Sequence, residues 1–362
     1  MMKLLVLSRY DRLGASSRLR MFQYFPWLES EGFEITVAPF FSDSYVLGLQ
    51  QSKRHILEVA RAYYSRVKNM LASREYHLVW IEKELLPWLP AQLELALLGD
   101  SVPYVLDYDD AVFHYYDLHR NPIVKSVLGR KHHALMRGAA LIIAGNDYIA
   151  DFAIRAGAKR IEVIPTVIDL DRYPAHKQFY IRGQSEPPNV GWVGQRSTVS
   201  NLLMFKNIFD RFSEERIAQF SAIGVTAQLF GLPMKSIPWS EHTEVADIAT
   251  FDIGIMPLVD EPFERGKCGY KLIQYMASGL PVVASPVGAN CQIVEHGVNG
   301  FLAETPAEWE QALGLLLADA DLRQRMGMAG RLKVEQKFSL QVTAPKLIEL
   351  FRDASHMNAK EA

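Results

Sequence analysis

The chain has 362 residues, of which 49% are hydrophobic and 22% charged, with a net charge of −2 and two cysteines. This length favours two domains of roughly 100–200 residues each, and the apolar content excludes disordered and collagen-like chains. Two cysteines can form at most one disulfide, which is too few to stabilise a secreted fold of this size. The near-neutral net charge argues against a nucleic-acid-binding protein. The sequence holds no run of 18 apolar residues and no signal-peptide pattern at residues 1–7. We therefore expect a cytoplasmic protein.

The first half of the sequence alternates short apolar runs with amphipathic or polar segments. Strands are predicted over residues 3–7, 33–38, 77–81, 103–106, 139–144 and 161–164. Alternating strands and helices are typical of a parallel sheet that is covered by helices on both faces. Residues 171–189 are polar, contain three prolines and predict a linker.

The same pattern restarts after the linker. Strands are predicted over residues 190–193, 228–230, 252–256, 281–284 and 300–302, and helices over 270–277, 308–317, 321–336 and 339–354. The predicted fold class is α/β, with two Rossmann-like domains at residues 1–172 and 189–338 that face a central cleft, followed by a helix and tail at 339–362. No G-x-G-x-x-G motif follows the first strand of either domain, which argues against a bound NAD or FAD, and no cofactor is expected.

Residues 251–302 carry the strongest chemical signal. A strand ends in a proline-containing loop, and a glycine-rich loop with Lys267 and Lys271 then opens the helix at 270–277. Unpaired backbone N–H groups at a helix start and nearby lysines form an anion site suited to a diphosphate. The alternative is a purely structural role, because glycine and lysine are common at helix starts.

Several segments are similar to glycosyltransferase family 4, the retaining "group 1" glycosyl transferases of GT-B fold. They are DIGIMP at 252–257, KLIQYMASGLPVVA at 271–284, EHGVNGF at 295–301 and, at the start of the second domain, GWVGQR at 191–196. The resemblance implies a nucleotide-sugar donor on the second domain and a C-terminal helix that crosses back to the first.

The resemblance also implies roles for individual residues. Arg196 and Lys271 would neutralise the leaving diphosphate, and with Asp110 they are the predicted catalytic residues. The predicted donor-binding residues are Gly194, Gln195, Lys267, Gln274, Gly288, Ala289 and Asn290. Many family members carry two glutamates separated by seven residues, and this sequence has Gly266 and Gln274 at those positions. The Gln274 amide can still bond a ribose hydroxyl, and the nucleobase is expected beside residues 231–239.

In the first half, Asp109 and Asp110 end a D-x-D-D run that follows the strand at 103–106. Such a triplet can hold a divalent metal in the GT-A fold, but that fold lacks the second Rossmann-like half, so no metal is expected. We expect Asp109 and Asp110 to orient an acceptor hydroxyl or to contact the donor sugar. The alternative is a helix-capping or turn carboxylate.

Two further segments are candidates for acceptor or partner binding. Gly14, Ser17 and Arg18 follow the first strand, where glycine permits close approach, serine can cap a helix and arginine can meet an anionic acceptor. A plain strand–helix turn explains them equally well. Residues 52–74 hold six cations against Glu58 alone, with apolar residues at helical spacing on one face. This helix either lies on an anionic membrane surface or packs on its own domain.

The function predicted from the sequence is metal-independent, retaining transfer of a hexosyl group from a nucleotide-diphosphate donor to a hydroxyl of a glycan or lipid-linked acceptor, in cell-surface polysaccharide or glycoconjugate synthesis. The predicted location is the cytoplasm, at the inner face of the membrane. Alternatives are a non-catalytic, nucleotide-sugar-binding partner of a transferase, and a phosphorylase-like or epimerase-like use of the fold.

Overall fold

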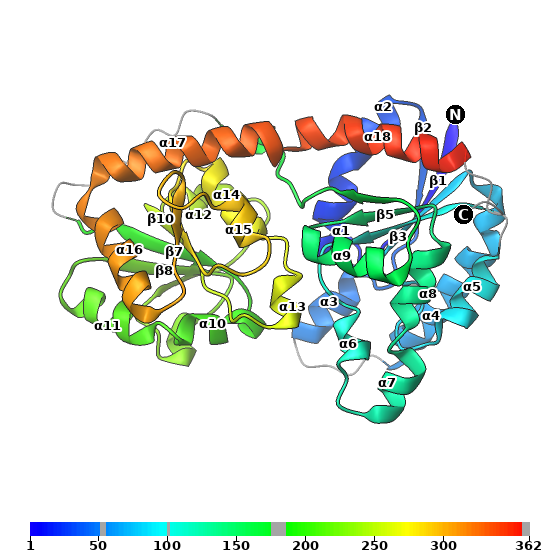
Figure 1. Ribbon diagram of the computed structural model, residues 1–362, viewed down its shortest axis with the longest axis horizontal. Helices are drawn as coiled ribbons and strands as arrows, with labels where there is room; N and C mark the ends of the chain where they lie inside the picture. The colour runs from blue at the N-terminus through cyan, green and yellow to red at the C-terminus, as the bar shows by residue number, and fades with distance from the viewer. Residues whose placement is uncertain (51–55, 100–101, 175–185, 357–362) are drawn as a thin grey trace. The chain divides into compact units, whose positions relative to one another are not determined.

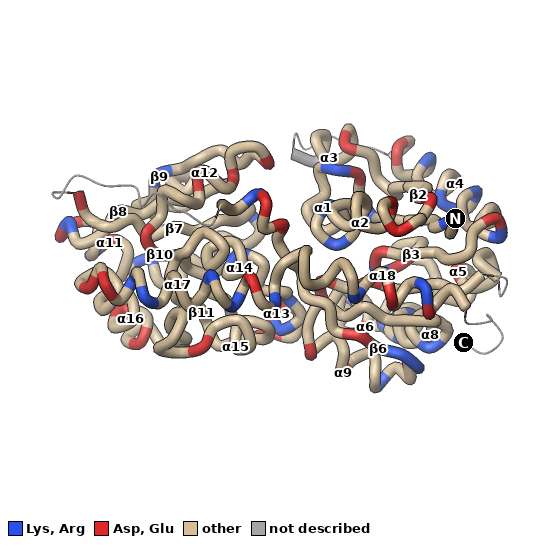
Figure 2. The backbone as a smooth tube through the Cα atoms, turned by 90° about the horizontal axis from the view of Figure 1, so that it is seen from above, with Lys and Arg blue, Asp and Glu red and all other residues tan. Residues whose placement is uncertain are grey.

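The computed structural model describes residues 1–50, 56–99, 102–174 and 186–356, and the chain forms two compact units (Figure 1). Unit 1 comprises Met1–Val167, Arg265–Cys268 and Leu340–Ala362, and unit 2 comprises Ile168–Glu264 and Gly269–Ser339. Positive and negative residues are interspersed along both units (Figure 2), in keeping with the net charge of −2.

A six-stranded parallel sheet forms the centre of unit 1, in the order β2-β1-β3-β4-β5-β6. The strands are β1 (Met2–Leu7), β2 (Phe33–Val37), β3 (Leu78–Glu82), β4 (Tyr104–Tyr108), β5 (Leu141–Ala144) and β6 (Ile161–Val163). The helices are α1 (Ala15–Arg20), η1 (Phe22–Tyr24), α2 (Phe25–Ser30), α3 (Asp43–Gln50), α4 (Ile56–Leu71), η2 (Ala72–Glu75), α5 (Ala91–Leu98), α6 (His114–Asp117), α7 (Pro122–Leu128), α8 (Lys131–Gly138), α9 (Asp147–Ala156) and α18 (Leu340–His356).

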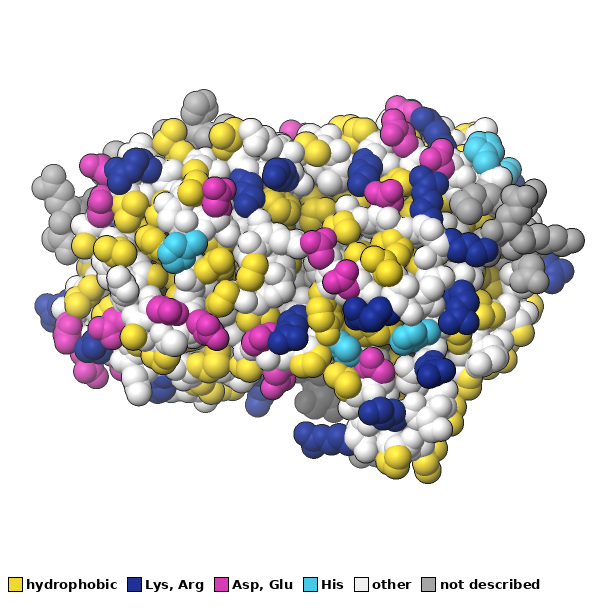
Figure 3. Space-filling model, in the orientation of Figure 1, with side chains coloured by type: hydrophobic (Ala, Val, Ile, Leu, Met, Phe, Trp, Pro, Cys, Tyr) yellow, Lys and Arg dark blue, Asp and Glu magenta, His cyan; other side chains and the backbone are white. Residues whose placement is uncertain are grey.

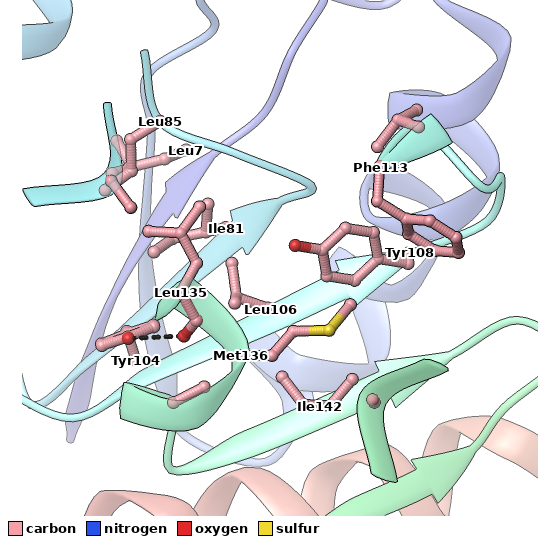
Figure 4. Packing of buried hydrophobic residues seen from close by; sticks show 14 of the residues in the cluster. Leu7, Ile81, Leu85, Tyr104, Leu106, Tyr108, Phe113, Leu135, Met136 and Ile142 are labelled. Atoms are coloured by element: carbon pink, nitrogen blue, oxygen red, sulfur yellow. Dashed lines mark hydrogen bonds between the residues drawn. The ribbon is translucent and has the colours of Figure 1, made fainter. Parts of the chain in front are cut away.

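Successive residues of the unit 1 strands enter opposite cores. On β1, Leu5 and Leu7 pack into one cluster, and Leu4 and Val6 pack into the other. The first cluster includes Tyr104, whose hydroxyl donates to the Leu135 carbonyl oxygen at 2.7 Å (Figure 4). The continuous apolar runs of the sequence therefore mark strands that are buried on both faces.

Helix α18 closes the second of these cores. Its Leu347 and Phe351 are buried with Trp80 of β3, whose ring lies edge-on to that of Phe351 at 4.9 Å between centroids. The Tyr24 and Thr343 hydroxyls are 2.9 Å apart. The predicted return of the C-terminal helix to the first domain is confirmed.

Unit 2 contains a second parallel sheet, in the order β12-β11-β10-β7-β8-β9. The strands are β7 (Asn189–Val193), β8 (Gln219–Ile223), β9 (Lys235–Ile237), β10 (Ile253–Met256), β11 (Val282–Ala284) and β12 (Gly300–Leu302). The helices are η3 (Leu170–Arg172), η4 (Arg196–Thr198), α10 (Ser200–Leu203), α11 (Lys206–Glu214), η5 (Ala227–Phe230), α12 (Glu244–Ile248), α13 (Pro262–Arg265), α14 (Tyr270–Ala277), α15 (Asn290–Ile293), α16 (Pro306–Ala318) and α17 (Ala320–Lys337). The predicted α/β class with two Rossmann-like halves is confirmed.

One predicted strand is wrong. Residues 228–230 lie in the helical turn η5, which ends at Gly231 with a φ of +66°. The Gln228 amide donates to the Met234 carbonyl oxygen at 2.8 Å, which closes this turn locally. The second and third strands of unit 2 are instead β8 and β9, which the sequence analysis missed.

Helix α4 differs from the helix predicted over residues 52–74, of which 52–55 lie outside the described residues. Ile56 is exposed, whereas Arg66 is buried. The Arg66 guanidinium donates to the Ser8 carbonyl oxygen at 2.5 Å, and burial lowers the pKa of Arg66 to about 9. One of the six cations of this segment therefore faces the core of unit 1.

Candidate functional site

Parallel sheets of this type bind ligands beyond the carboxyl ends of the strands, at the point where the strand order reverses. In unit 2 the order reverses between β7 and β10, and in unit 1 between β1 and β3. Most of the predicted site residues follow these strands or their neighbours. Each unit therefore has its own candidate site.

In unit 2, Gly194 and Arg196 directly follow β7. The Gly194 N–H donates to the Ile223 carbonyl oxygen at 3.0 Å, and a Cβ at this position would lie 2.2 Å from the Trp192 ring, so only glycine fits. Gln195 and Arg196 are exposed, and the Arg196 guanidinium lies 6.0 Å from the centroid of the Phe230 ring. The turn thus presents Arg196 to solvent at the carboxyl end of β7.

Lys271 reaches the same strand from α14. Its ammonium lies 4.7 Å from the centroid of the Trp192 ring, at the distance of a cation–π contact. Lys271 is partly exposed, whereas Trp192 is buried. Unit 2 therefore brings both predicted catalytic cations, Arg196 and Lys271, to the end of β7.

Gln274 lies inside unit 2. Its side chain is 1% exposed, and its amide donates to the Tyr173 hydroxyl at 3.3 Å. The amide thus already has a protein partner, and its contact with a ribose stays a prediction.

The loop after β11 places Gly288, Ala289 and Asn290 before and at the start of α15. Asn290 is buried, and its amide donates to the Ser285 carbonyl oxygen at 3.0 Å. Over the described part of the chain, the backbone N–H groups of Gly288 and Ala289 donate to no backbone or side-chain acceptor. These two groups are available to an anion.

Lys267 belongs to unit 1 rather than to the unit that holds the other donor-binding candidates. The Asn146 amide donates to the carbonyl oxygens of Gly266 at 2.7 Å and Lys267 at 3.1 Å. A Cβ on Gly266 would lie 2.3 Å from the Ala111 Cβ. The family's first glutamate position therefore has no room for a side chain in this protein.

In unit 1, Asp109 is the centre of a cluster that the sequence analysis found only in part. The Lys83 ammonium lies 2.7 Å from Asp109 Oδ1 and donates to Ser16 Oγ at 3.0 Å, and Ser16 donates to Asp109. Burial by itself would raise the pKa of Asp109, but the Lys83 charge outweighs burial and lowers it. Asp110 follows in the same turn, where its carbonyl oxygen accepts from the Val112 N–H.

The residues after β1 are less accessible than the sequence suggested. Ser17 is buried, and its hydroxyl donates to Glu82 Oε2 at 2.6 Å instead of capping a helix. Arg18 is buried and donates to the Arg12 carbonyl oxygen at 3.1 Å. A Cβ on Gly14 would overlap Tyr10. These residues thus bind other residues of unit 1, and their contact with an acceptor stays a prediction.

The sequence analysis missed Glu82 and Lys83. Three consecutive charges, Glu82, Lys83 and Glu84, follow an apolar strand, and this is the signal that could have identified them. Lys83 has a φ of +66°, and the Glu84 N–H donates to the Glu82 carbonyl oxygen at 2.8 Å across it. This tight three-residue turn is strained for a residue other than glycine.

We expect Lys83→Met to raise the pKa of Asp109, because only the Ser16 hydrogen bond and the Arg20 charge then oppose the effect of burial. Lys83→Gly removes the same charge but accepts the positive φ, so its free energy of unfolding should exceed that of Lys83→Met by about 1 kcal/mol. Carbon-detected NMR titration of the carboxyl and urea unfolding measure the two effects. Lys83→Arg keeps the charge and is the control. An unchanged Asp109 pKa in Lys83→Met would contradict the ion pair.

No group of three metal-ligating side chains lies close enough to hold a metal ion within residues 1–50, 56–99, 102–174 and 186–356. The D-x-D carboxylates Asp107 and Asp109 instead face Arg20 and Lys83. No helix in these ranges combines the length and the hydropathy that a membrane crossing requires.

Known proteins are similar to part of unit 2 in sequence and to the chain in fold. Residues 187–319 match the family model described as "Glycosyl transferases group 1". A D-inositol 3-phosphate glycosyltransferase of Nocardia farcinica is 35% identical over 229 residues, 55% of this chain and 49% of that protein. The matched segments span about a fifth to a half of the lengths of the curated relatives.

Solved structures match over nearly the whole chain. The sucrose-phosphate synthase of Thermosynechococcus elongatus gives a TM-score of 0.73 at 17% identity, covering 98% of this chain and 99% of that one. HepE of Anabaena, solved in complex with UDP and glucose, gives 0.71 at 17% identity, covering 98% and 100%. At this identity the likeness shows the fold, which is GT-B. Residues 187–319 of this chain are similar to the group 1 glycosyl transferases.

Proposed function

We propose that this protein is a metal-independent, retaining glycosyltransferase that moves a hexosyl group from a nucleoside diphosphate to a hydroxyl of a glycan or lipid-linked acceptor. The observation that carries the proposal is that Arg196 follows β7 closely and that the Lys271 ammonium lies 4.7 Å from the ring of Trp192 on the same strand, in the unit that contains the family match. HepE, of the same fold, has been solved with UDP-glucose, which supports UDP as the first donor to test.

In the proposed mechanism, the bond between the sugar's anomeric carbon and the diphosphate oxygen breaks, and negative charge develops on the leaving diphosphate. Arg196 and Lys271 stabilise this charge, and because it is greatest in the transition state, the cations accelerate the reaction. The free N–H groups of Gly288 and Ala289 are available to the same phosphates. The acceptor oxygen bonds the anomeric carbon on the face that the diphosphate leaves, and its proton passes to a phosphate oxygen.

The acceptor side of the proposal rests on unit 1. Asp110 would contact the acceptor hydroxyl, and Lys83 holds the neighbouring Asp109 ionised and in place. Acceptors of this kind include lipid-linked sugars in the synthesis of cell-surface polysaccharides. We therefore include in the proposal that the protein works at the cytoplasmic face of a membrane, where the residue 52–74 helix is one candidate contact.

A second candidate function is non-catalytic binding of a nucleotide sugar as the partner of a transferase. Gly266 and Gln274 stand where many family members carry glutamates, and the absence of both carboxylates favours this second function. The Gly266 position cannot hold a side chain without displacing Ala111. Turnover distinguishes the two functions, whereas donor binding does not.

A donor screen tests the proposal. Purified protein is mixed with a panel of nucleotide sugars, and its unfolding temperature and the release of nucleoside diphosphate are followed. We expect one donor to raise the unfolding temperature and to be slowly consumed, and consumption to accelerate with added glycan or lipid acceptors. Stabilisation without release, even with acceptors present, would favour the non-catalytic partner. No stabilisation by any donor would overturn the proposed site.

A further inference from the structure

The α6–α7 segment of unit 1 carries apolar side chains that its own fold leaves exposed. Figure 1 shows α6 and α7 projecting at the lower end of unit 1, and Figure 3 shows hydrophobic and basic side chains at the same projection. Its exposed hydrophobic residues include Leu118 (52% exposed), Ile123 (71%) and Val127 (58%). Ile123 and Val127 are four residues apart on α7 and share one helix face.

Trp88 belongs to the same surface. It is 52% exposed, and its ring lies edge-on to that of His119 at 5.9 Å between centroids. Trp88 has a φ of +63°, a conformation that costs free energy for a residue other than glycine. We call Trp88, Leu118, Ile123 and Val127, with the exposed cations Arg120 and Lys125, the α6–α7 surface.

The charge of this region is one-sided. From Leu118 to Asn146 the sequence contains five lysines and arginines and no aspartate or glutamate. Of these cations, Lys131 is buried between Glu84 and Glu94 at 2.7 Å from each, and the other four are exposed. The nearest preceding carboxylate, Asp117, is 2.8 Å from His114. From Leu118 to Asn146 the exposed charge beside the apolar side chains is therefore positive, and the partly exposed Asp117 borders this stretch.

Helix α4 is also rich in exposed apolar residues, but its charge is mixed. Its solvent-facing cations Arg61 and Lys68 share the helix with Glu58, and Arg66 points into the core. The two segments thus differ in the sign of their charged side chains, which is the property that decides binding to an anionic surface.

We propose that the α6–α7 surface docks this protein on an anionic lipid membrane. Apolar side chains that project among exposed cations insert between lipid headgroups while the cations pair with phosphates. Each cation near such a surface strengthens binding by about fivefold. Four partly exposed apolar side chains supply far less area than the roughly 800 Å² per partner of a standard protein–protein interface. The inference deepens the membrane part of the proposed function and rests on it, but it is independent of the donor site in unit 2.

Sedimentation with lipid vesicles tests the inference. The full-length protein is mixed with vesicles of phosphatidylcholine and phosphatidylglycerol, or of phosphatidylcholine alone, and the pelleted fraction is measured. We expect pelleting with the anionic vesicles only. The double variant Ile123→Ser/Val127→Ser should lower the partition coefficient at least about tenfold, and Lys125→Glu should lower it less. Leu57→Ser/Tyr64→Ser removes exposed side chains from α4, the contact that the sequence suggested, and should bind as the wild type does. The matched control, Met328→Ser/Leu332→Ser on α17, removes two exposed apolar side chains four residues apart and should also bind as the wild type does.

Three outcomes would overturn the inference. They are failure to pellet with anionic vesicles, equal pelleting with neutral vesicles, and loss of binding in the α4 variant while the α7 variant still binds. All substituted residues are exposed, and unchanged unfolding temperatures will verify that the variants fold. UDP-dependent thermal stabilisation is measured on the same samples. A variant that loses vesicle binding but keeps UDP binding separates failure of this inference from failure of the donor site.

Discussion

Replacing Lys271 by alanine is expected to lower the rate of nucleoside diphosphate release by about 10²–10³-fold, and replacing Arg196 by alanine should have an effect of similar size. The Lys271 ammonium is held 4.7 Å from the Trp192 ring, so it stands in place before charge develops. Removing the ammonium should destabilise the transition state more than it weakens binding of the donor. We therefore expect kcat to fall further than KM rises, measured by coupled detection of the released diphosphate.

Lys337→Ala is the matched control for these variants. Lys337 is an exposed lysine of the same unit, at the end of helix α17, which contains no predicted site residue. It should keep wild-type kinetics. If Lys271→Ala and Arg196→Ala kept them as well, the diphosphate would not lie at the end of β7, and the proposed donor site would be wrong.

The second large effect concerns the stability of unit 1. Arg20 of α1 and Asp107 of β4 are each 2% exposed in their side chains, and Arg20 Nε lies 2.7 Å from Asp107 Oδ1. The same guanidinium donates to the Ile164 carbonyl oxygen at 2.8 Å. Arg20→Met leaves a buried carboxylate without its counter-charge. We expect the free energy of unfolding to fall by about 3–5 kcal/mol near neutral pH.

This loss should depend on pH. Burial raises the pKa of Asp107 to about 6 even beside Arg20, and without the arginine that pKa rises further. Between about pH 6 and that higher pKa, the carboxyl is protonated in the folded variant but ionised in the folded wild type. The destabilisation should therefore shrink as the pH falls toward 6 and level off below it. The double variant Arg20→Met/Asp107→Asn removes both charges and should recover most of the loss at neutral pH. Urea unfolding at several pH values measures this, and a pH-independent loss would show that packing, not charge, is responsible.

The sequence predicted regular elements best where their apolar pattern is continuous. The helix at 270–277 was predicted with the bounds of α14, and the strands of unit 1 within one or two residues. Strand β8 was missed because its sequence, QFSAI, mixes polar and apolar residues, although four of its five residues are buried. β8 is buried because it lies between β7 and β9 in the sheet. These neighbouring strands are distant in the sequence, so a local pattern does not reveal the burial.

The residues of the candidate site also divide into those that a local sequence pattern reveals and those that no local pattern reveals. Arg196 and Lys271 were found because they lie within segments that resemble a known family. Lys83 was missed because its partners Ser16 and Asp109 are 67 and 26 residues away along the chain. Similarly, no local pattern shows that Lys267 packs with Asn146, or that Arg66 turns inward to the Ser8 carbonyl. Contacts of this kind exist only after the sheet has formed.

Unit 1 is assembled from three separate stretches of chain, the last of which is α18. During synthesis, the ribosome must pass residue 351 before Leu347 and Phe351 can pack with Trp80. Until then one face of the first sheet lacks its cover, whereas unit 2 has all its residues by Ser339. The second half of this protein can therefore finish folding before the first, and fragments that end before α18 are expected to aggregate rather than to yield a usable first domain.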